Sequence, residues 1–118
     1  MREVVTGIFA VAAAPDGDEV AFEEFIRLNH SERTSAPRAV PSLREFAWRQ
    51  LRKRRHEYLK DVADAGTFTI NRTDPTKIDD KTLTVRLFLV SSGRSPTPIT
   101  LKRDPAVDGA WRITDSSL

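Results

Sequence analysis

Three polar side chains that could act together in acid–base chemistry are spaced four residues apart in the chain. Gln50, Arg54 and Tyr58 would share one face of a helix, because residues four apart are neighbours on a helix surface. Tyr and Arg side chains can stabilise an oxyanion, and His30 could serve as the general base. No Asp or Glu lies on the faces that we expect to point inward, so the sequence names no carboxylate base.

The residue types that several other chemistries need are missing. The chain of 118 residues has no Cys and two His residues. It therefore has no thiolate metal site and no thiol nucleophile, and a metal centre built on His would need carboxylates to complete it. A glycine-rich phosphate loop and a Gly-x-Ser-x-Gly elbow are also absent. We expect neither a cofactor nor a metal, and the sequence identifies no substrate.

The element that must position these side chains is a long helix, which the sequence predicts over Ser42–Gly66. Ser42 followed three residues later by Glu45 is the capping-box pattern, and Gly66 suits the left-handed position after a helix end. One side of this helix is apolar and the other is charged, which is typical of a helix that packs on a partner surface. The apolar side consists of Leu43, Phe46, Ala47, Leu51, Tyr58, Val62 and Ala65.

Gln50 and Arg54 interrupt the apolar side of the predicted helix. A buried guanidinium needs a partner, because its charge is costly to remove from water. Arg54 either reaches the helix edge and pairs with an acid of this chain, or lines a polar pocket beneath the helix. In the second interpretation a small molecule is a candidate ligand, and the candidate pocket residues are Gln50, Arg54, Tyr58 and Trp111.

Two shorter helices precede the long helix, and a meander of strands follows it. The apolar spacing predicts helices over residues 2–14 and from the turn at 16–19 to His30, where the helix dipole would favour a protonated imidazole. A connecting loop is predicted over residues 31–41. After Gly66 the apolar period changes from about 3.6 residues to about two. Strands are predicted near 67–70, 81–91, 98–102 and 110–115, with a loop over 71–80.

This order of elements indicates a single α+β domain over residues 1–118. Three N-terminal helices would pack on one face of a curved antiparallel meander of about four strands. We expect the inward residues of the sheet to face the apolar side of the long helix. These inward residues are Phe68, Ile70, Leu83, Val85, Leu87, Leu89, Ile99, Leu101, Trp111 and Ile113.

In this pattern the chain resembles the nuclear-transport-factor-2-like, or cystatin-like, superfamily, in its helix-helix-helix-then-strands variant. The resemblance covers nearly the whole length: a front helix ending in an acidic turn (12–22), the long helix, the meander, and a closing run over 108–113. That run contains the Gly-x-Trp-x-Ile pattern that is common in the family's last strand. The resemblance implies a cone-shaped fold, in which the sheet wraps the long helix and leaves a conical pocket.

The same resemblance leaves two classes of function open. Many members are non-enzymatic modules for small-ligand binding, protein interaction or dimerisation, and others are cofactor-independent acid–base enzymes such as isomerases, dehydratases and cyclases. The pocket Asp, His or Tyr groups of the enzymatic members do not map onto this chain residue by residue. We therefore favour the non-enzymatic class, and keep as the alternative an acid–base enzyme with its pocket under the long helix.

A second face of the predicted sheet would carry Arg86, Phe88 and Val90. Two large apolar residues on a face that no helix covers indicate a homodimer contact, as this fold family often makes. The alternative is that they are scattered apolar residues of an ordinary surface.

Charge is nearly balanced, with a formal net charge of +2, but it is unevenly distributed. Acidic residues outnumber basic ones in residues 1–41, and the reverse holds in 42–65, so these two parts of the fold could attract each other. Few aromatic residues accompany the basic helix face and acidic residues dilute it, so we do not expect nucleic acid as a partner. No apolar run approaches the roughly 20 residues that span a bilayer. We interpret residues 1–14 as a helix rather than a secretory signal, and slightly favour a cytoplasmic location.

Overall fold

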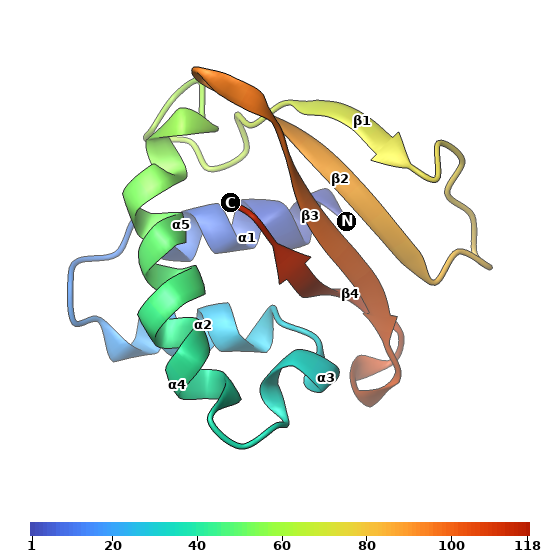
Figure 1. The fold of residues 1–118 in the computed structure, drawn as a ribbon, viewed down its shortest axis with the longest axis horizontal. Coiled ribbons are helices and arrows are strands. Elements are labelled where there is room, and N and C mark those ends of the chain that lie inside the picture. The colour runs from blue at the N-terminus through green and yellow to red at the C-terminus, as the bar shows by residue number, and fades with distance from the viewer.

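A four-stranded antiparallel sheet and a layer of helices make up the computed structural model, which describes residues 1–118 (Figure 1). The helices are α1 (Arg2–Val11), α2 (Glu19–Arg27), α3 (Ser31–Thr34), α4 (Ala39–Leu43) and α5 (Arg49–Arg54). The strands are β1 (Ile70–Asp74), β2 (Thr84–Ser91), β3 (Arg94–Asp104) and β4 (Ala110–Ser116). The prediction of an α+β fold with the helices before an antiparallel meander is therefore confirmed, in the strand order β1-β2-β3-β4.

The long helix is a single rod built from several helical segments. A π-helical turn, Arg44–Trp48, joins α4 to α5, and a short 3-10 turn, Arg55–Glu57, ends the rod. A fourth helix, α3, lies in the segment predicted to be a connecting loop. Its first turn is capped by the ring of His30, which accepts a hydrogen bond from the backbone N–H of Glu32.

The predicted bounds of the long helix, Ser42–Gly66, are wrong at both ends. Arg38 adopts a left-handed conformation and the helix begins directly after it, so Ser42 already donates its backbone N–H to the Arg38 carbonyl and is not a cap. Beyond Tyr58 the chain forms turns, held by hydrogen bonds from the Thr67 hydroxyl to the carbonyls of Asp61 and Asp64. Short polar side chains of this kind offer the backbone an alternative to the helix.

The π turn also changes which side of the rod is buried. Leu43 and Trp48 are five residues apart and both are buried, which is the spacing that a π turn, and not an α turn, brings to one face. Phe46, predicted on the apolar side, is 67% exposed instead. Trp48 packs against two rings of α2, at 5.8 Å from the ring centroid of Phe22 and 4.9 Å from that of Phe25.

The helix behind the strands is α1, and the rod stands beside the sheet (Figure 1). Val5, Ile8 and Phe9 of α1 are at most 1% exposed and form the centre of the core. The expectation that the long helix itself lies across the sheet therefore needs correction. The reason is that α1 is apolar on most of its surface and can be covered on two sides, by the sheet and by the rod, whereas the rod keeps a charged side in water.

The inner face of the sheet is formed largely as predicted. Leu87 pairs with Ile99 and Leu101 pairs with Ile113, and all four side chains are buried. Leu83, predicted to point inward, is 62% exposed because it precedes the first residue of β2. Strand β1 also runs through Asp74, in the segment predicted to be a loop. The pairing of β1 with β2 is irregular between Ile70 and Arg72, which breaks the two-residue period. The sequence of β1 therefore lacks the alternation of inward and outward residues that predicts a strand.

We predict that Leu51→Ala and Phe46→Ala will have very different effects on stability. Leu51 is buried in the core, so its truncation should lower the free energy of unfolding by about 2–5 kcal/mol. Phe46 is mostly exposed, so its truncation should change that free energy by no more than about 0.5 kcal/mol. Urea denaturation followed by circular dichroism measures both. Similar losses in the two variants would contradict the observed rotation of the rod.

Candidate functional site

The space between the rod, α1, α2 and the sheet is filled by side chains. The cavity enclosed there has a volume of about 10 Å³ and is lined mainly by apolar residues. Such a volume holds one water molecule at most. The lining residues are Ile8, Phe25, Arg33, Ala47, Leu51, Ile113, Ser116 and Leu118.

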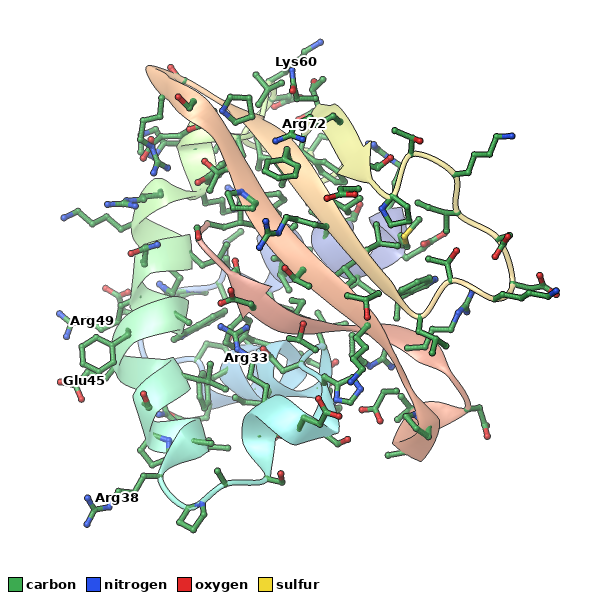
Figure 2. The ribbon with its side chains drawn as sticks, turned by 45° about the vertical axis from the view of Figure 1, so that its right-hand side comes forward. Arg33, Arg38, Glu45, Arg49, Lys60 and Arg72 are labelled. Atoms are coloured by element: carbon green, nitrogen blue, oxygen red, sulfur yellow. The ribbon has the colours of Figure 1, made fainter.

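Arg33 is the only ionisable side chain at this cavity, and it lies within the body of the molecule (Figure 2). Its guanidinium donates a hydrogen bond to the side-chain oxygen of Asn29 at 2.7 Å. Asn29 in turn donates its side-chain amide to the Phe25 carbonyl. Burial lowers the pKa of Arg33 from its ordinary value, against a smaller opposing effect of Asp115. This group therefore anchors α3 to the end of α2.

The structure brings two of the four candidate pocket residues together, on the outer flank of the rod. Gln50 and Arg54 line one open groove of about 580 Å³. The side-chain amide of Gln50 donates hydrogen bonds to the carbonyls of Ser117 and Leu118, at 3.2 and 2.9 Å. Arg54 is half-buried, and its side chain makes no hydrogen bond or ion pair with another residue. The acid partner that one interpretation gave Arg54 is not present.

Tyr58 and Trp111 lie elsewhere, so the four residues do not surround one cavity. The Tyr58 ring is buried against Phe9, at 5.7 Å between centroids, and its hydroxyl accepts a hydrogen bond from Arg94 at 2.7 Å. Trp111 is half-buried at the start of β4, where the guanidinium of Arg103 lies 4.4 Å from its ring centroid. Both aromatic side chains are therefore engaged in packing contacts.

The groove that contains Gln50 and Arg54 is strongly basic. It is also lined by Arg49, Arg52 and Lys53, and Asp16 is its only acidic residue. Asp16 forms an ion pair with Arg52, with 2.6 Å between the charged atoms. Arg49, Lys53 and Arg54 make no ion pair, and Figure 2 shows Arg49 pointing away from the body of the protein. This groove thus holds three cations that no acid of the chain neutralises.

A second open groove, of about 590 Å³, adjoins the first and shares Trp48 and Arg49 with it. Its other lining residues are Val40, Pro41, Arg44 and Glu45. Arg44 is occupied, because it makes a two-pronged contact with Glu19 at 2.9 and 2.7 Å. The hydrogen bond from Arg44 lowers the pKa of Glu19. Together with the Arg52–Asp16 pair, this contact confirms the expected attraction between the acidic front of the chain and its basic helix.

Ser31, His30 and Asp104 form a buried cluster where the start of α3 meets the end of β3. Asp104 accepts hydrogen bonds from the backbone N–H and the hydroxyl of Ser31, at 2.8 and 3.0 Å, and from the N–H of Ala106. The Nε2 atom of His30 lies 3.2 Å from the Arg103 carbonyl and 3.9 Å from the Asp104 carboxylate. Ser31 therefore donates to Asp104 and not to His30, so the three do not form a nucleophile–base pair.

His30 is buried and uses both ring nitrogens within the fold. Its Nδ1 atom accepts the Glu32 N–H at 3.0 Å, and its Nε2 atom lies 3.2 Å from the Arg103 carbonyl. The prediction that the second helix extends to His30 is wrong. The helix α2 ends at Arg27, and His30 caps the start of α3 instead.

The pKa of Asp104 is lowered in spite of its burial. Burial would raise the pKa of this carboxyl, but the hydrogen bonds from the backbone N–H groups of Ser31 and Ala106 and from the Ser31 hydroxyl outweigh that effect. Asp104 thus holds α3 and the turn after β3 as a charged acceptor.

The outer face of the sheet carries the three residues predicted to form a dimer contact. Arg86, Phe88 and Val90 alternate along β2 with the buried Leu87 and Leu89. The guanidinium of Arg72, from the neighbouring strand β1, lies 3.8 Å from the ring centroid of Phe88. On the other side Phe88 pairs with Pro98 of β3.

Sequence reasoning missed two features of these sites. Arg72 was placed in a loop, so its stacking on Phe88 was not foreseen. The residues around it, 71–74, are all polar and gave only a weak strand signal. The Ser31–Asp104 contact joins residues far apart in the sequence, and no local pattern indicates it. The basic run 49–55 was evident, but the sequence did not show which of its members would find partners.

Other kinds of site are not evident in the structure. No group of three or more His, Cys, Asp or Glu side chains is arranged to hold a metal ion. None of the helices is both long enough and apolar enough to cross a bilayer.

No protein-family model matches this chain, and no curated protein or solved structure is significantly similar to it.

We predict that Asp104→Asn will lower the stability of the fold at neutral pH and will make that stability less dependent on pH in the acidic range. Because the folded pKa of Asp104 is below its unfolded value, the carboxylate stabilises the fold above about pH 4, and this contribution is lost as pH falls through the folded pKa. Thermal unfolding from pH 7 down to pH 2.5 checks this, with the exposed Asp108→Asn as the matched control. An equal acid dependence in Asp104→Asn and the unsubstituted protein would contradict the assignment.

Proposed function

We propose that the protein is a non-enzymatic protein-interaction module that forms a homodimer through the outer face of its sheet. The observation that carries this proposal is the packed interior: the enclosed space beside the rod is about 10 Å³, which leaves no room for a substrate-sized molecule. Features able to make specific contacts lie on the surface instead. This favours protein interaction over the binding of a small molecule under the helix.

The outer sheet face has the composition of a self-complementary contact. In Figure 1 helix α1 lies behind the sheet, and no element covers the face toward the viewer. Phe88, Pro98 and the 43% exposed Val90 supply apolar surface near its centre. Charges of both signs surround it, as Asp74 pairs in register with Arg86. Two copies related by a twofold axis could place opposite charges together around the Phe88 rings.

The resemblance to the nuclear-transport-factor-2-like superfamily supports the same proposal. The four-stranded meander, the preceding helices and the long rod agree with that pattern at the level of the α+β class. The closing Gly-x-Trp-x-Ile run forms the start of β4, after a turn in which Asp108 and Gly109 both have positive φ. We propose that the chain is a member of this superfamily whose conical pocket is closed by side chains.

The alternative, an acid–base enzyme, finds less support in the arrangement of titratable groups. Such an enzyme needs a base within reach of a bound substrate. The only ionisable side chain at the enclosed cavity is that of Arg33. Asp104 and His30, the buried candidates for proton transfer, are hydrogen-bonded to the backbone around α3.

We predict that Phe88→Glu will convert a dimer into a monomer with an intact fold. The added carboxylate would lie at the centre of the contact and would lose its hydration without a fixed partner. Sedimentation equilibrium over a range of protein concentrations measures the mass, and circular dichroism checks the fold.

The matched control is Val62→Glu, which introduces the same acid at an exposed apolar residue outside the sheet. It should leave the mass unchanged. An unsubstituted protein that stays monomeric at every concentration, or a Phe88→Glu variant that stays dimeric, would refute the proposed interface.

A further inference from the structure

Two adjoining grooves run along the exposed flank of the rod and form one continuous surface. The first is lined by residues from Trp48 to Arg54 together with Asp16 and Gly17, and the second by residues from Val40 to Arg49. They share Trp48 and Arg49. At about 1.5 Å per residue, the flank from Val40 to Arg54 is about 20 Å long. We call this surface the rod groove.

The two ends of the rod groove differ in chemistry. One end has Val40, Pro41 and the edge of Trp48, and Phe46 projects from the same stretch of helix with 67% of its surface exposed. The other end carries Arg49, Lys53 and Arg54, none of which pairs with an acid of the chain. The remaining cations of the two grooves, Arg44 and Arg52, are occupied by Glu19 and Asp16.

Interactions within the chain explain the position of some of these cations but not the exposure of Phe46. The negative end of the helix dipole favours cations in the last turn of α5, which accounts for Lys53 and Arg54. It does not account for Phe46, which the π turn places in water although Trp48, two residues later, is buried. An exposed aromatic ring beside unpaired guanidinium groups has the composition of a protein-binding surface.

We infer that the rod groove binds an acidic polypeptide segment, with apolar side chains at one end and carboxylates at the other. Apolar side chains of the partner would pack on Phe46, Val40 and Pro41. Its carboxylates would pair with Arg49, Lys53 and Arg54, where guanidinium groups can bind a carboxylate through two parallel hydrogen bonds. This inference rests on the proposed role in protein interaction, and it adds a second surface and the class of partner.

Charge and composition favour a polypeptide over a nucleic acid. A nucleic acid needs a contiguous positive surface and aromatic rings on which bases stack. The rod groove instead has Glu45 and Asp16 on its rim, and one of its ends is apolar. Trp48 is the one aromatic residue that lines the two grooves and it is buried, and the exposed ring of Phe46 lies outside their lining.

The test is binding of a fluorescein-labelled peptide of about 14 residues, the number that spans the rod groove as a helix. The peptide has leucines toward one end and glutamates toward the other. Fluorescence anisotropy at low and at physiological salt measures Kd for the full chain. Two further probes are the same peptide with lysine in place of glutamate, and a single-stranded oligothymidine of equal charge. The acidic peptide should bind, more weakly at high salt, and neither other probe should bind comparably.

Variants locate the site. The double change Arg49→Glu with Lys53→Glu should weaken binding of the acidic peptide by about tenfold or more, because attraction becomes repulsion. Phe46→Ser should weaken it while leaving the salt dependence unchanged. The matched control, Lys77→Glu with Lys81→Glu, makes the same change of charge in the loop between β1 and β2 and should have little effect.

Three results would overturn the inference: no binding of the acidic peptide at low salt, equal binding of the oligothymidine, or an equal loss of affinity in the control variant. The sheet-face dimer is tested separately, since Arg49→Glu with Lys53→Glu should leave the mass of the protein in sedimentation unchanged. A failure of peptide binding with an intact dimer therefore contradicts only the rod groove. A monomeric protein that still binds the peptide contradicts only the sheet interface.

Discussion

The arrangement of the helical layer depends on the insertion of Trp48 between the rod and α2. Its ring contacts Phe22 and Phe25, and the π turn at Arg44–Trp48 is what allows it to reach them. One extra residue in that turn rotates the rest of the rod relative to a regular helix. Trp48 is then buried and Phe46 faces water, whereas Leu51 and Tyr58 face the core as a regular helical projection also predicts. Burial of a large aromatic side chain outweighs the poorer hydrogen-bond geometry of a π turn.

The same rotation determines which side chains of the rod lie on the protein surface, where another molecule could contact them. With Trp48 turned inward beside Leu51, the interior is filled, and the polar residues Gln50 and Arg54 lie on the flank of the rod instead of beneath it. The ion pairs Arg44–Glu19 and Arg52–Asp16 join the rod to the acidic front of the chain. Exposed pairs of this kind contribute little to stability, because water and salt screen them, so their main effect is to fix the positions of the surface side chains. The cations that remain unpaired give the rod groove its charge.

The sequence was sufficient for the features that follow from local periodicity. The strand predicted over 81–91 is found over 84–91, because Val85, Leu87 and Leu89 recur at every second residue, and the meander followed from the turns between strands. The rod was misplaced because a helical projection assumes a constant angle per residue, and a single π turn breaks that assumption. The prediction of a pocket beneath the rod used the same helical projection, which placed Gln50, Arg54 and Tyr58 on one face. Contacts between distant residues, such as Ser31 with Asp104, leave no local signal.

The most direct test of this account is the burial of Trp48 in a Trp111→Phe variant, where it is the only tryptophan. If the π turn carries its ring into the core, its fluorescence emission will lie at short wavelength and iodide will quench it only after unfolding. A regular helix would instead place Trp48 at the margin and Phe46 in the core. Emission at the wavelength of tryptophan in water, with ready quenching by iodide in the folded protein, would contradict the account.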